Sequence, residues 1–249
     1  MTNIYQATDG YFGGRSLARQ SGTKGGARHV FVKIDDIKDD LVFPTGGGQV
    51  MNPFLGAAKI YAGDLMEFRT DDNGLKGKVY ILKTYEVVAY DATNKKLSVK
   101  RSGYHHIPFV GDTLTVAPST IGGTGEKLEV VGRTATTTAD GKDVWELILS
   151  GAVTTAPQAG DILVESDADG KMLIKNINAV AAWDYDFLWN QAADPNATTP
   201  DFEAARYFLT PSLRGTMYIS RMSPMPQCVK DLNIANINGW FRIDALNKK

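Results

Sequence analysis

His105 and His106 are the only adjacent histidines in this chain of 249 residues, and imidazole is both a common metal ligand and a common general base. Neighbouring residues of a strand face opposite sides of a sheet, so the two rings would not converge on one ion. A zinc site needs several convergent ligands, and no cysteine lies near this pair in the sequence. The pair therefore predicts a polar strand end before Pro108 rather than a metal or catalytic site.

The acidic stretch 165–170 is similar to the start of a calcium-binding EF-hand loop. It has oxygen-bearing side chains at alternate positions and a glycine at the sixth. The twelfth position holds Asn176 in place of the bidentate glutamate, and the flanking residues are typical of strands rather than helices. We therefore expect a hairpin turn here and no calcium ion.

Two glycine-rich stretches, 10–15 and 122–127, lack the spacing of a phosphate-binding loop, and neither opens a helix after a buried strand. Cys228 is the only cysteine, so no intrachain disulfide can form. No histidine is close enough in sequence to suggest an activated thiol. We therefore predict no catalytic, cofactor-binding or metal-binding residues, and a protein that is not an enzyme.

One phrase occurs three times: glycine, aspartate and a short run of β-forming residues, at 63–68, 111–116 and 160–165. Glycine and aspartate both tolerate tight-turn backbone geometry, and the residues that follow suit a pleated, half-buried surface. The copies start 48 and 49 residues apart. The repeat predicts a β-rich body built from similar strand starts.

Residues 51–180 are expected to form this body. Three strand pairs are predicted, each across a turn: 78–90 with 96–101, 127–131 with 144–149, and 161–165 with 171–175. Short strands separated by turn signals, without long helices, predict a mainly β fold with an antiparallel barrel or sandwich.

Residues 1–50 predict an extended, glycine-rich and basic arm. Over 1–33, five Lys and Arg residues face a single acidic residue, and such a segment buries too little apolar area to offset its ordering entropy. The arm either orders on a neighbouring subunit, or remains a disordered terminus or a loop on its own body.

Residues 181–249 are rich in aromatic side chains and are expected to contact the body or a partner. A short helix is predicted at 201–209, started by Thr199 or Asp201 and ended by Pro211. From the arm and this segment we select, as candidate partner-binding residues, Arg15, Arg19, Lys24, Arg28, Trp240 and Phe241.

Apolar residues make up 43% of the chain and charged residues 22%, and the net charge is -1. This balance gives no reason to expect a nucleic acid or a membrane as partner. The N-terminus lacks the features of a signal peptide, and a chain with one cysteine suits synthesis in a reducing cytoplasm.

The chain resembles auxiliary capsid proteins of tailed bacteriophages, the decoration or head-fibre class, and in particular those of phages that infect gut Bacteroidota. The resemblance is carried by the polar, glycine-rich arm at 8–26, the three glycine-aspartate strand starts and the threonine-rich hairpin 132–141. The lack of cysteine chemistry fits as well. It covers the β-rich body best and includes no diagnostic motif.

The resemblance implies a structural virion protein that is made in the bacterial cytoplasm and located on the capsid surface. Its partner would be the major capsid protein, whose subunit contacts it would reinforce, and further contacts with itself or other head proteins are open. Two alternatives stay open: a tail or connector component, and a carbohydrate-binding or adhesion module that uses exposed tryptophans such as Trp145.

Overall fold

The computed structural model describes residues 19–20, 47–52, 59–70, 77–103, 105–181, 184–186, 208–212, 215–218, 222–232 and 241–244. The fold is mainly β, as the sequence predicts, and one short helix, α2 (Gln227–Lys230), lies in the described part of the C-terminal segment. The strands are β1 (Arg19–Gln20), β2 (Gly48–Val50), β3 (Lys59–Ile60), β4 (Leu65–Thr70), β5 (Gly77–Ile81), β6 (Thr84–Asp91), β7 (Lys96–Lys100), β8 (Thr113–Val116), β9 (Leu128–Thr137), β10 (Asp143–Leu149), β11 (Ile162–Glu165), β12 (Ala179–Val180), β13 (Tyr185–Asp186), β14 (Phe208–Leu209), β15 (Gly215–Tyr218) and β16 (Phe241–Asp244).

Six strands close into an antiparallel barrel in the order β10-β7-β6-β11-β8-β9, so this sheet has no open edge. The strands β8, β9 and β10 are successive neighbours, and β7 lies beside β10, which is a Greek-key arrangement. Apolar residues alternate along β6, β7 and the first part of β9, and these side chains fill the interior. The buried barrel core consists of Tyr85, Val87, Leu97, Val99, Leu114, Leu128, Val130, Leu147, Leu149 and Leu163.

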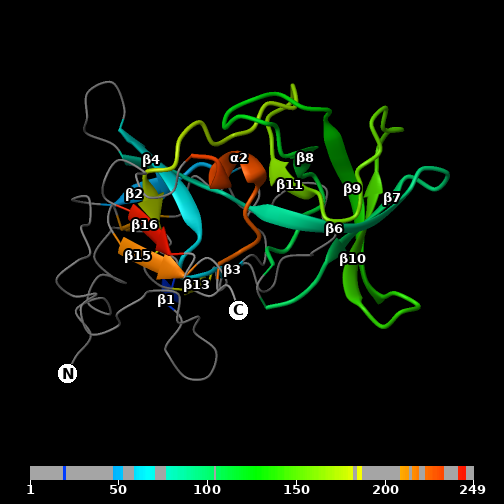
Figure 1. Ribbon diagram of the computed structural model, residues 1–249, viewed down its shortest axis with the longest axis horizontal. Helices are drawn as coiled ribbons and strands as arrows, with labels where there is room; N and C mark the ends of the chain where they lie inside the picture. Colours follow the sequence, from blue (N-terminus) through cyan, green and yellow to red (C-terminus); the bar gives the residue numbers. More distant parts are fainter. Residues whose placement is uncertain are drawn as a thin grey trace.

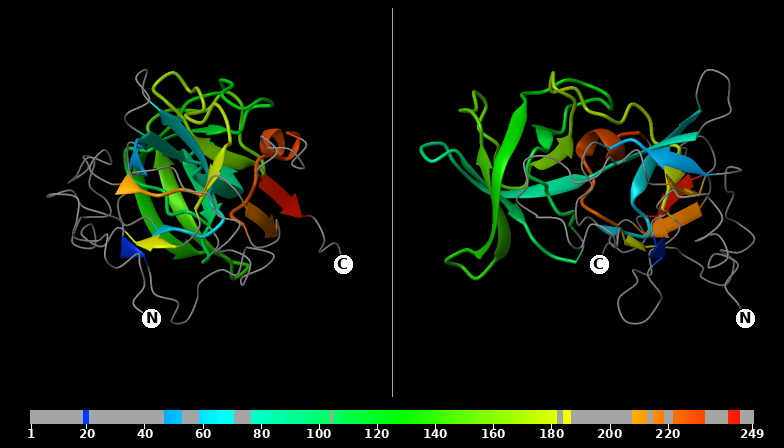
Figure 2. Two further views of the ribbon diagram at one scale, coloured as in Figure 1. Left: turned by 90° about the vertical axis from the view of Figure 1, so that its left-hand side faces the viewer. Right: turned by 180° about the vertical axis from the view of Figure 1, so that it is seen from behind.

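A five-stranded sheet, ordered β12-β4-β5-β2-β14, lies beside the barrel, with α2 between the two (Figure 1). The small sheets β1-β13-β3 and β15-β16 lie at the same end of the molecule as the five-stranded sheet, as the right-hand view of Figure 2 shows. The five-stranded sheet takes β2 from the end of the predicted arm and β14 from the predicted C-terminal segment. The predicted division at 50 and 180 stays a prediction.

The chain crosses from the five-stranded sheet to the barrel at Leu82 and Lys83, between β5 and β6. The Lys83 N–H donates to Ile81 O at 3.0 Å, which closes a tight turn and ends β5. The prediction of one strand over 78–90 was therefore wrong. The run of β-forming residues is continuous in the sequence, but its two halves belong to different sheets.

Two of the three predicted strand pairs form, β6 with β7 and β9 with β10. The third does not: residues 171–175 form no strand, and only the bridge from Ser166 to Met172 remains. The expected turn at 165–170 is present, because the Asp167 carboxylate accepts from the Asp169 and Lys171 N–H groups and Gly170 has a φ of 77°. β11 instead pairs with β6 and β8 in the barrel.

The predicted helix at 201–209 is wrong at its end, where Phe208 and Leu209 form β14 and pair with β2. The rest of that helix, with Thr199 and Asp201, lies outside the described residues. Tertiary pairing overrides the helical spacing of apolar residues at this point.

The repeated phrase is one turn used three times. Gly63, Gly111 and Gly160 have φ values of 86°, 100° and 93°, a region that glycine adopts without strain. In each copy the aspartate N–H donates to the carbonyl oxygen three residues earlier, at 3.0–3.1 Å, and the aspartate carboxylate accepts the N–H of that same residue, at 2.7–2.8 Å. The glycine N–H and the aspartate C=O also form a matching pair of bonds with one residue of a facing segment: Ala181, Val130 and Val87, respectively.

Gly160 tests the turn, because an added Cβ would meet no heavy atom within 4 Å and only the backbone would be strained. We expect Gly160→Ala to lower the free energy of unfolding by about 1–2 kcal/mol. The matched control is Gly151→Ala, at an exposed glycine with equal room and no positive φ. This control should be neutral or slightly stabilising. Urea denaturation measures both, and equal stabilities would contradict the strain argument.

Candidate functional site

A buried ionic cluster lies where the barrel meets the five-stranded sheet, and we call Lys83, Asp112 and Glu165 the joint cluster. The Lys83 Nζ lies 3.2 Å from Asp112 Oδ1 and 3.3 Å from Glu165 Oε1. The exposed fractions of the three residues are 1%, 0% and 4%. Lys83 comes from the crossing between the sheets, Asp112 from the second glycine-aspartate turn and Glu165 from the end of β11.

Each of the two carboxyls of the joint cluster also accepts hydrogen bonds from neutral groups, through the oxygen that does not contact Lys83. Asp112 Oδ2 accepts from the Phe109 N–H at 2.7 Å and the Tyr85 hydroxyl at 3.3 Å. Glu165 Oε2 accepts from Asn52 Nδ2 at 2.6 Å. Asn52 also bonds both backbone groups of Ile81, so one amide links the end of β5 to the cluster.

Burial dominates the titration of the joint cluster. It raises the pKa of Glu165 to about 7, aided by the Asp112 charge and opposed by Lys83. Burial also opposes the charged form of Lys83, but the two carboxyls outweigh it and raise the Lys83 pKa. Burial, with Asp112 and Glu165, raises the pKa of Tyr85 well above its usual value, so the phenol keeps its proton.

Glu165 Oε1 makes its ionic contact with Lys83 but accepts no hydrogen bond. A buried oxygen that lacks a hydrogen bond loses hydration without full compensation. Such exceptions in native proteins often accompany strain or chemistry. The joint cluster is therefore not an ideally satisfied ion pair.

A second buried group lies beside the first. His106 Nδ1 accepts from the Thr84 N–H at 3.0 Å, so the ring proton sits on Nε2 and is donated to Asp64 Oδ2, also at 3.0 Å. Ser223 Oγ donates to Asp64 Oδ1 at 2.5 Å. In a hydrolytic triad the serine bonds to the histidine. Here serine and histidine both bond to the aspartate, so the arrangement links loops and does not activate the serine.

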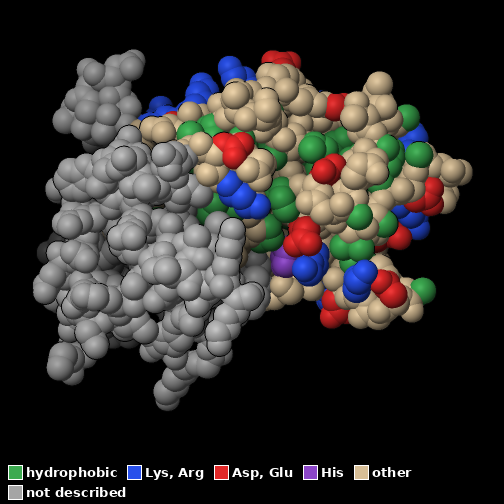
Figure 3. Space-filling model, viewed as in Figure 1, with side chains coloured by type: hydrophobic (Ala, Val, Ile, Leu, Met, Phe, Trp, Pro, Cys, Tyr) green, Lys and Arg blue, Asp and Glu red, His purple; other side chains and the backbone are tan. Residues whose placement is uncertain are grey.

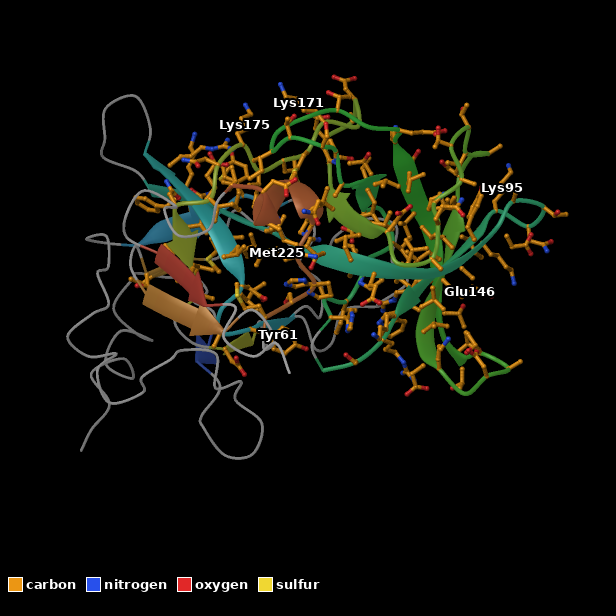
Figure 4. All side chains as sticks on the ribbon, in the orientation of Figure 1. Tyr61, Lys95, Glu146, Lys171, Lys175 and Met225 are labelled. Carbon is orange, nitrogen blue, oxygen red and sulfur yellow. The ribbon has the colours of Figure 1, made fainter. Side chains whose placement is uncertain are left out.

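A shallow hollow next to this group is bordered by Asp64, Thr84, Met222 and Ser223 and has room for about one water molecule. Figure 4 shows Met225, which also borders it, between the five-stranded sheet and the barrel. This hollow is too small for a substrate of ordinary size.

The two adjacent histidines contact different partners. His105 Nδ1 lies 2.6 Å from Ser102 Oγ, and its Nε2 lies 3.2 Å from Glu86 Oε2, whereas His106 turns inward to Asp64. Burial, with Glu86 acting in the opposite direction, lowers the pKa of His105. The pair lies in the connection between β7 and β8 rather than at a strand end.

Of the predicted partner-binding residues, Arg19 lies in β1 and pairs with Asp186 of β13, and Phe241 lies in β16 and pairs with Gly215 of β15. The structure brings neither of these strands next to the other in a sheet. The remaining four lie outside the described residues: Arg15, Lys24, Arg28 and Trp240.

Other motifs have structural roles. In the second glycine-rich stretch, Thr124 forms a β-bridge with Lys171, and Gly125 lies close to Gly170.

Cys228 is buried, and this burial raises the thiol pKa, which lowers its reactivity. The Arg133 guanidinium lies 4.5 Å from the centre of the Trp145 ring, and Arg101 lies 5.5 Å from it.

Within the described ranges, no group of three or more His, Cys, Asp or Glu side chains is arranged to hold a metal ion. No helix in the described part of the chain is long and apolar enough to cross a membrane.

The sequence analysis missed Lys83 and Asp112 as members of one site, and it treated Glu165 only as the end of a strand and the start of an acidic loop. Signals for them exist. Lys83 directly follows the apolar residues Ile81 and Leu82 within a β-forming run. Apolar Phe109 and Val110 precede Asp112, whereas polar Gln158 precedes the half-exposed Asp161.

Comparison with known proteins gives no match to any family model, to any curated protein or to any solved structure.

Asp112 and Asp161 occupy the same position in two copies of the glycine-aspartate turn, one buried and one half exposed. Substituting each measures how much burial adds to the contribution of this aspartate to stability. Asp112→Ala removes one carboxylate from the buried Lys83 and two acceptor bonds, and we expect a loss of about 3–5 kcal/mol in the free energy of unfolding. Asp161→Ala removes the same turn bond at a half-exposed position and should lose only about 1 kcal/mol. Equal losses in urea denaturation would show that the turn alone accounts for the effect.

Glu165 makes stability depend on pH. The folded protein keeps this proton up to about pH 7, and the unfolded chain releases it near 4.5, so between these values the folded state binds more protons. The stabilisation is complete below the lower value and is lost as pH rises through the upper one. The unfolding free energy of wild type relative to Glu165→Gln should fall by about 1–3 kcal/mol from about pH 5 to about pH 7.5. A rise over this range, measured by urea denaturation, would contradict the prediction.

Proposed function

We propose that this chain is a structural, non-enzymatic virion protein that binds the outer surface of a phage capsid and reinforces contacts between major capsid subunits. The observation that supports the proposal is the location of the ionisable side chains that contact one another. Lys83, Asp112, Glu165, Asp64 and His106 are all buried at the joint, where they hold two sheets together. Their ion pairs and hydrogen bonds link the segments of a framework, which is the use expected of such groups in a structural protein.

The end of the molecule opposite the barrel supports an assembly role. Several sheets there are built from strands of two to four residues contributed by distant segments: β1, β3, β12, β13, β14, β15 and β16. Strands this short add little stability by themselves. An added strand from a neighbouring subunit supplies main-chain hydrogen bonds to such a sheet.

One segment of the predicted arm, β1, pairs with another strand of its own chain. Its two residues, Arg19 and Gln20, pair antiparallel with β13 of the same chain. An arm segment that completes a sheet within its own chain can complete the equivalent sheet of a neighbour by the same hydrogen bonds, which is the exchange expected of an assembling shell.

The barrel presents a mixed surface. Lys, Arg, Asp and Glu side chains are interspersed on the face seen in Figure 3. Figure 4 shows Lys95 at the far end of the β6–β7 hairpin, and Lys171 and Lys175 pointing outward along one edge. Interspersed charge favours solubility over nonspecific attraction, which suits a protein displayed on the outside of a particle.

The test is cosedimentation of the purified chain with shells assembled from the major capsid protein of the same virion. We expect wild type to bind, and reversal of the predicted basic arm (Arg15, Arg19, Lys24 and Arg28, each to Glu) to weaken binding about tenfold or more, because charge complementarity contributes to docking.

The matched control reverses four exposed lysines of the body, Lys95, Lys142, Lys171 and Lys175, and should bind like wild type. A wild-type chain that fails to sediment with shells at low ionic strength would overturn the proposal. A body variant that binds more weakly than the arm variant would move the contact from the arm to the body.

A further inference from the structure

The joint cluster contains the two groups from which an amide bond forms, an amine and a carboxyl, in contact with each other. It holds one primary amine, away from water, 3.2 Å from one carboxyl and 3.3 Å from another. These distances are to the carboxylate oxygens, each of which is bonded to the carbon that an amine would attack. Reacting groups held in contact in a fixed orientation reach effective concentrations of about 10⁵–10⁸ M. We propose that Lys83 Nζ and Asp112 Cγ condense into an intramolecular amide bond in the folded protein, with Glu165 transferring the protons.

The surroundings of Asp112 favour it as the carboxyl that is attacked. Oδ2 accepts hydrogen bonds from the Phe109 N–H and the Tyr85 hydroxyl, and Oδ1 faces the amine. Two donors on one oxygen polarise the carbonyl and stabilise the negative charge that develops there during attack, as an oxyanion hole does. Tyr85 remains a donor because burial holds its phenol in the protonated form.

Glu165 suits the role of proton carrier. Oε1 faces the amine without accepting a hydrogen bond, and Asn52 fixes Oε2. Its pKa of about 7 allows it to accept and return a proton near neutral pH. Oε1 lies 3.3 Å from the amine and is the oxygen that would receive the proton.

The step balances without any further reactant. A proton passes from the ammonium to the Asp112 carboxylate through Glu165, which leaves a neutral amine and a carboxylic acid. The nitrogen lone pair forms the N–Cγ bond, and the Cγ–Oδ1 bond then breaks. Oδ1 leaves as water with its own hydrogen and a second one from the nitrogen, again through Glu165. The ammonium and carboxylate together have the atoms of one amide and one water.

The environment also favours the product. A buried ion pair keeps much of its desolvation penalty, whereas an amide is neutral, and the released water is lost to bulk solvent. The bond would join the start of β6 to the turn before β8, and so would tie the crossing between the two sheets covalently to the barrel. This inference does not depend on capsid binding.

The first experiment is intact mass of the full-length chain under denaturing conditions after incubation of the folded protein near neutral pH. We expect a mass lower than the sequence mass by one water, and a proteolytic digest in which a single linked peptide joins the Lys83 and Asp112 segments. Succinimide formation at any of the three Asp-Gly pairs (Asp9-Gly10, Asp140-Gly141 and Asp169-Gly170) would also remove water, so the linked peptide decides. Peptides carrying Lys96 and Glu146, an ion pair at 2.9 Å that is partly exposed, should be recovered unlinked.

Three variants assign the roles. Lys83→Met should keep its full mass, and Glu165→Gln should lose most of the reaction. Asp112→Asn should still react and release ammonia in place of water. Loss of ammonia from Glu165→Gln, with a link to Lys83, would instead make Glu165 the carboxyl attacked and overturn the assignment.

The wild-type result decides the proposal even if a variant fails to fold. A folded wild-type chain that keeps its full sequence mass after long incubation, from mildly acidic to mildly alkaline pH, would show that Lys83 and Asp112 form an ion pair only. A linked chain should also migrate faster than Lys83→Met in a denaturing gel, because the closed loop limits its expansion.

Discussion

A buried amine between two carboxyls, at the place where the chain leaves one sheet for another, is the constraint on which this structure depends. Water would solvate Lys83, Asp112 and Glu165 far better than the apolar core does, so each charge is tolerated only while the others stay in place. The three residues come from the crossing, a turn and a strand end. The joint cluster therefore links the crossing to the turn before β8 and to the end of β11 through contacts that depend on geometry.

Apolar contacts supply the bulk of the stability on both sides of the joint. The barrel interior is a closed core of its own, and a second cluster, which includes Leu82, Val164, Met225 and Val229, joins the crossing, the barrel and α2. The glycine-aspartate turn occurs three times in the chain and has the same backbone hydrogen bonds in each copy. Its aspartates differ in surroundings: Asp64 meets His106 and Ser223, Asp112 meets Lys83, and Asp161 is half exposed. One local motif thus serves both as a turn and, where it is buried, as a source of polar links between segments.

The proposed capsid role and the proposed amide bond concern different parts of the same molecule. The first concerns exchange with neighbouring subunits, for which the short strands and the predicted basic arm are suited. The second concerns its interior, where a covalent bond would replace an ion pair at the joint. A protein that is exposed outside a cell gains from a bond that survives local unfolding, as disulfides do in oxidising surroundings, and this chain has a single cysteine.

Local preferences were readable from the sequence: the mainly β class, two hairpins and the three glycine-aspartate turns all follow from turn geometry and alternation, which act over a few residues. Non-local outcomes were not. The stretch 78–90 reads as one strand because its β preference is continuous, yet sheet membership divides it at Lys83. Phe208 and Leu209 have helical spacing, but pairing with β2 makes them a strand. The members of the joint cluster are far apart in sequence, so only tertiary structure decided that they meet, because burial and charge contact are properties of the assembled fold.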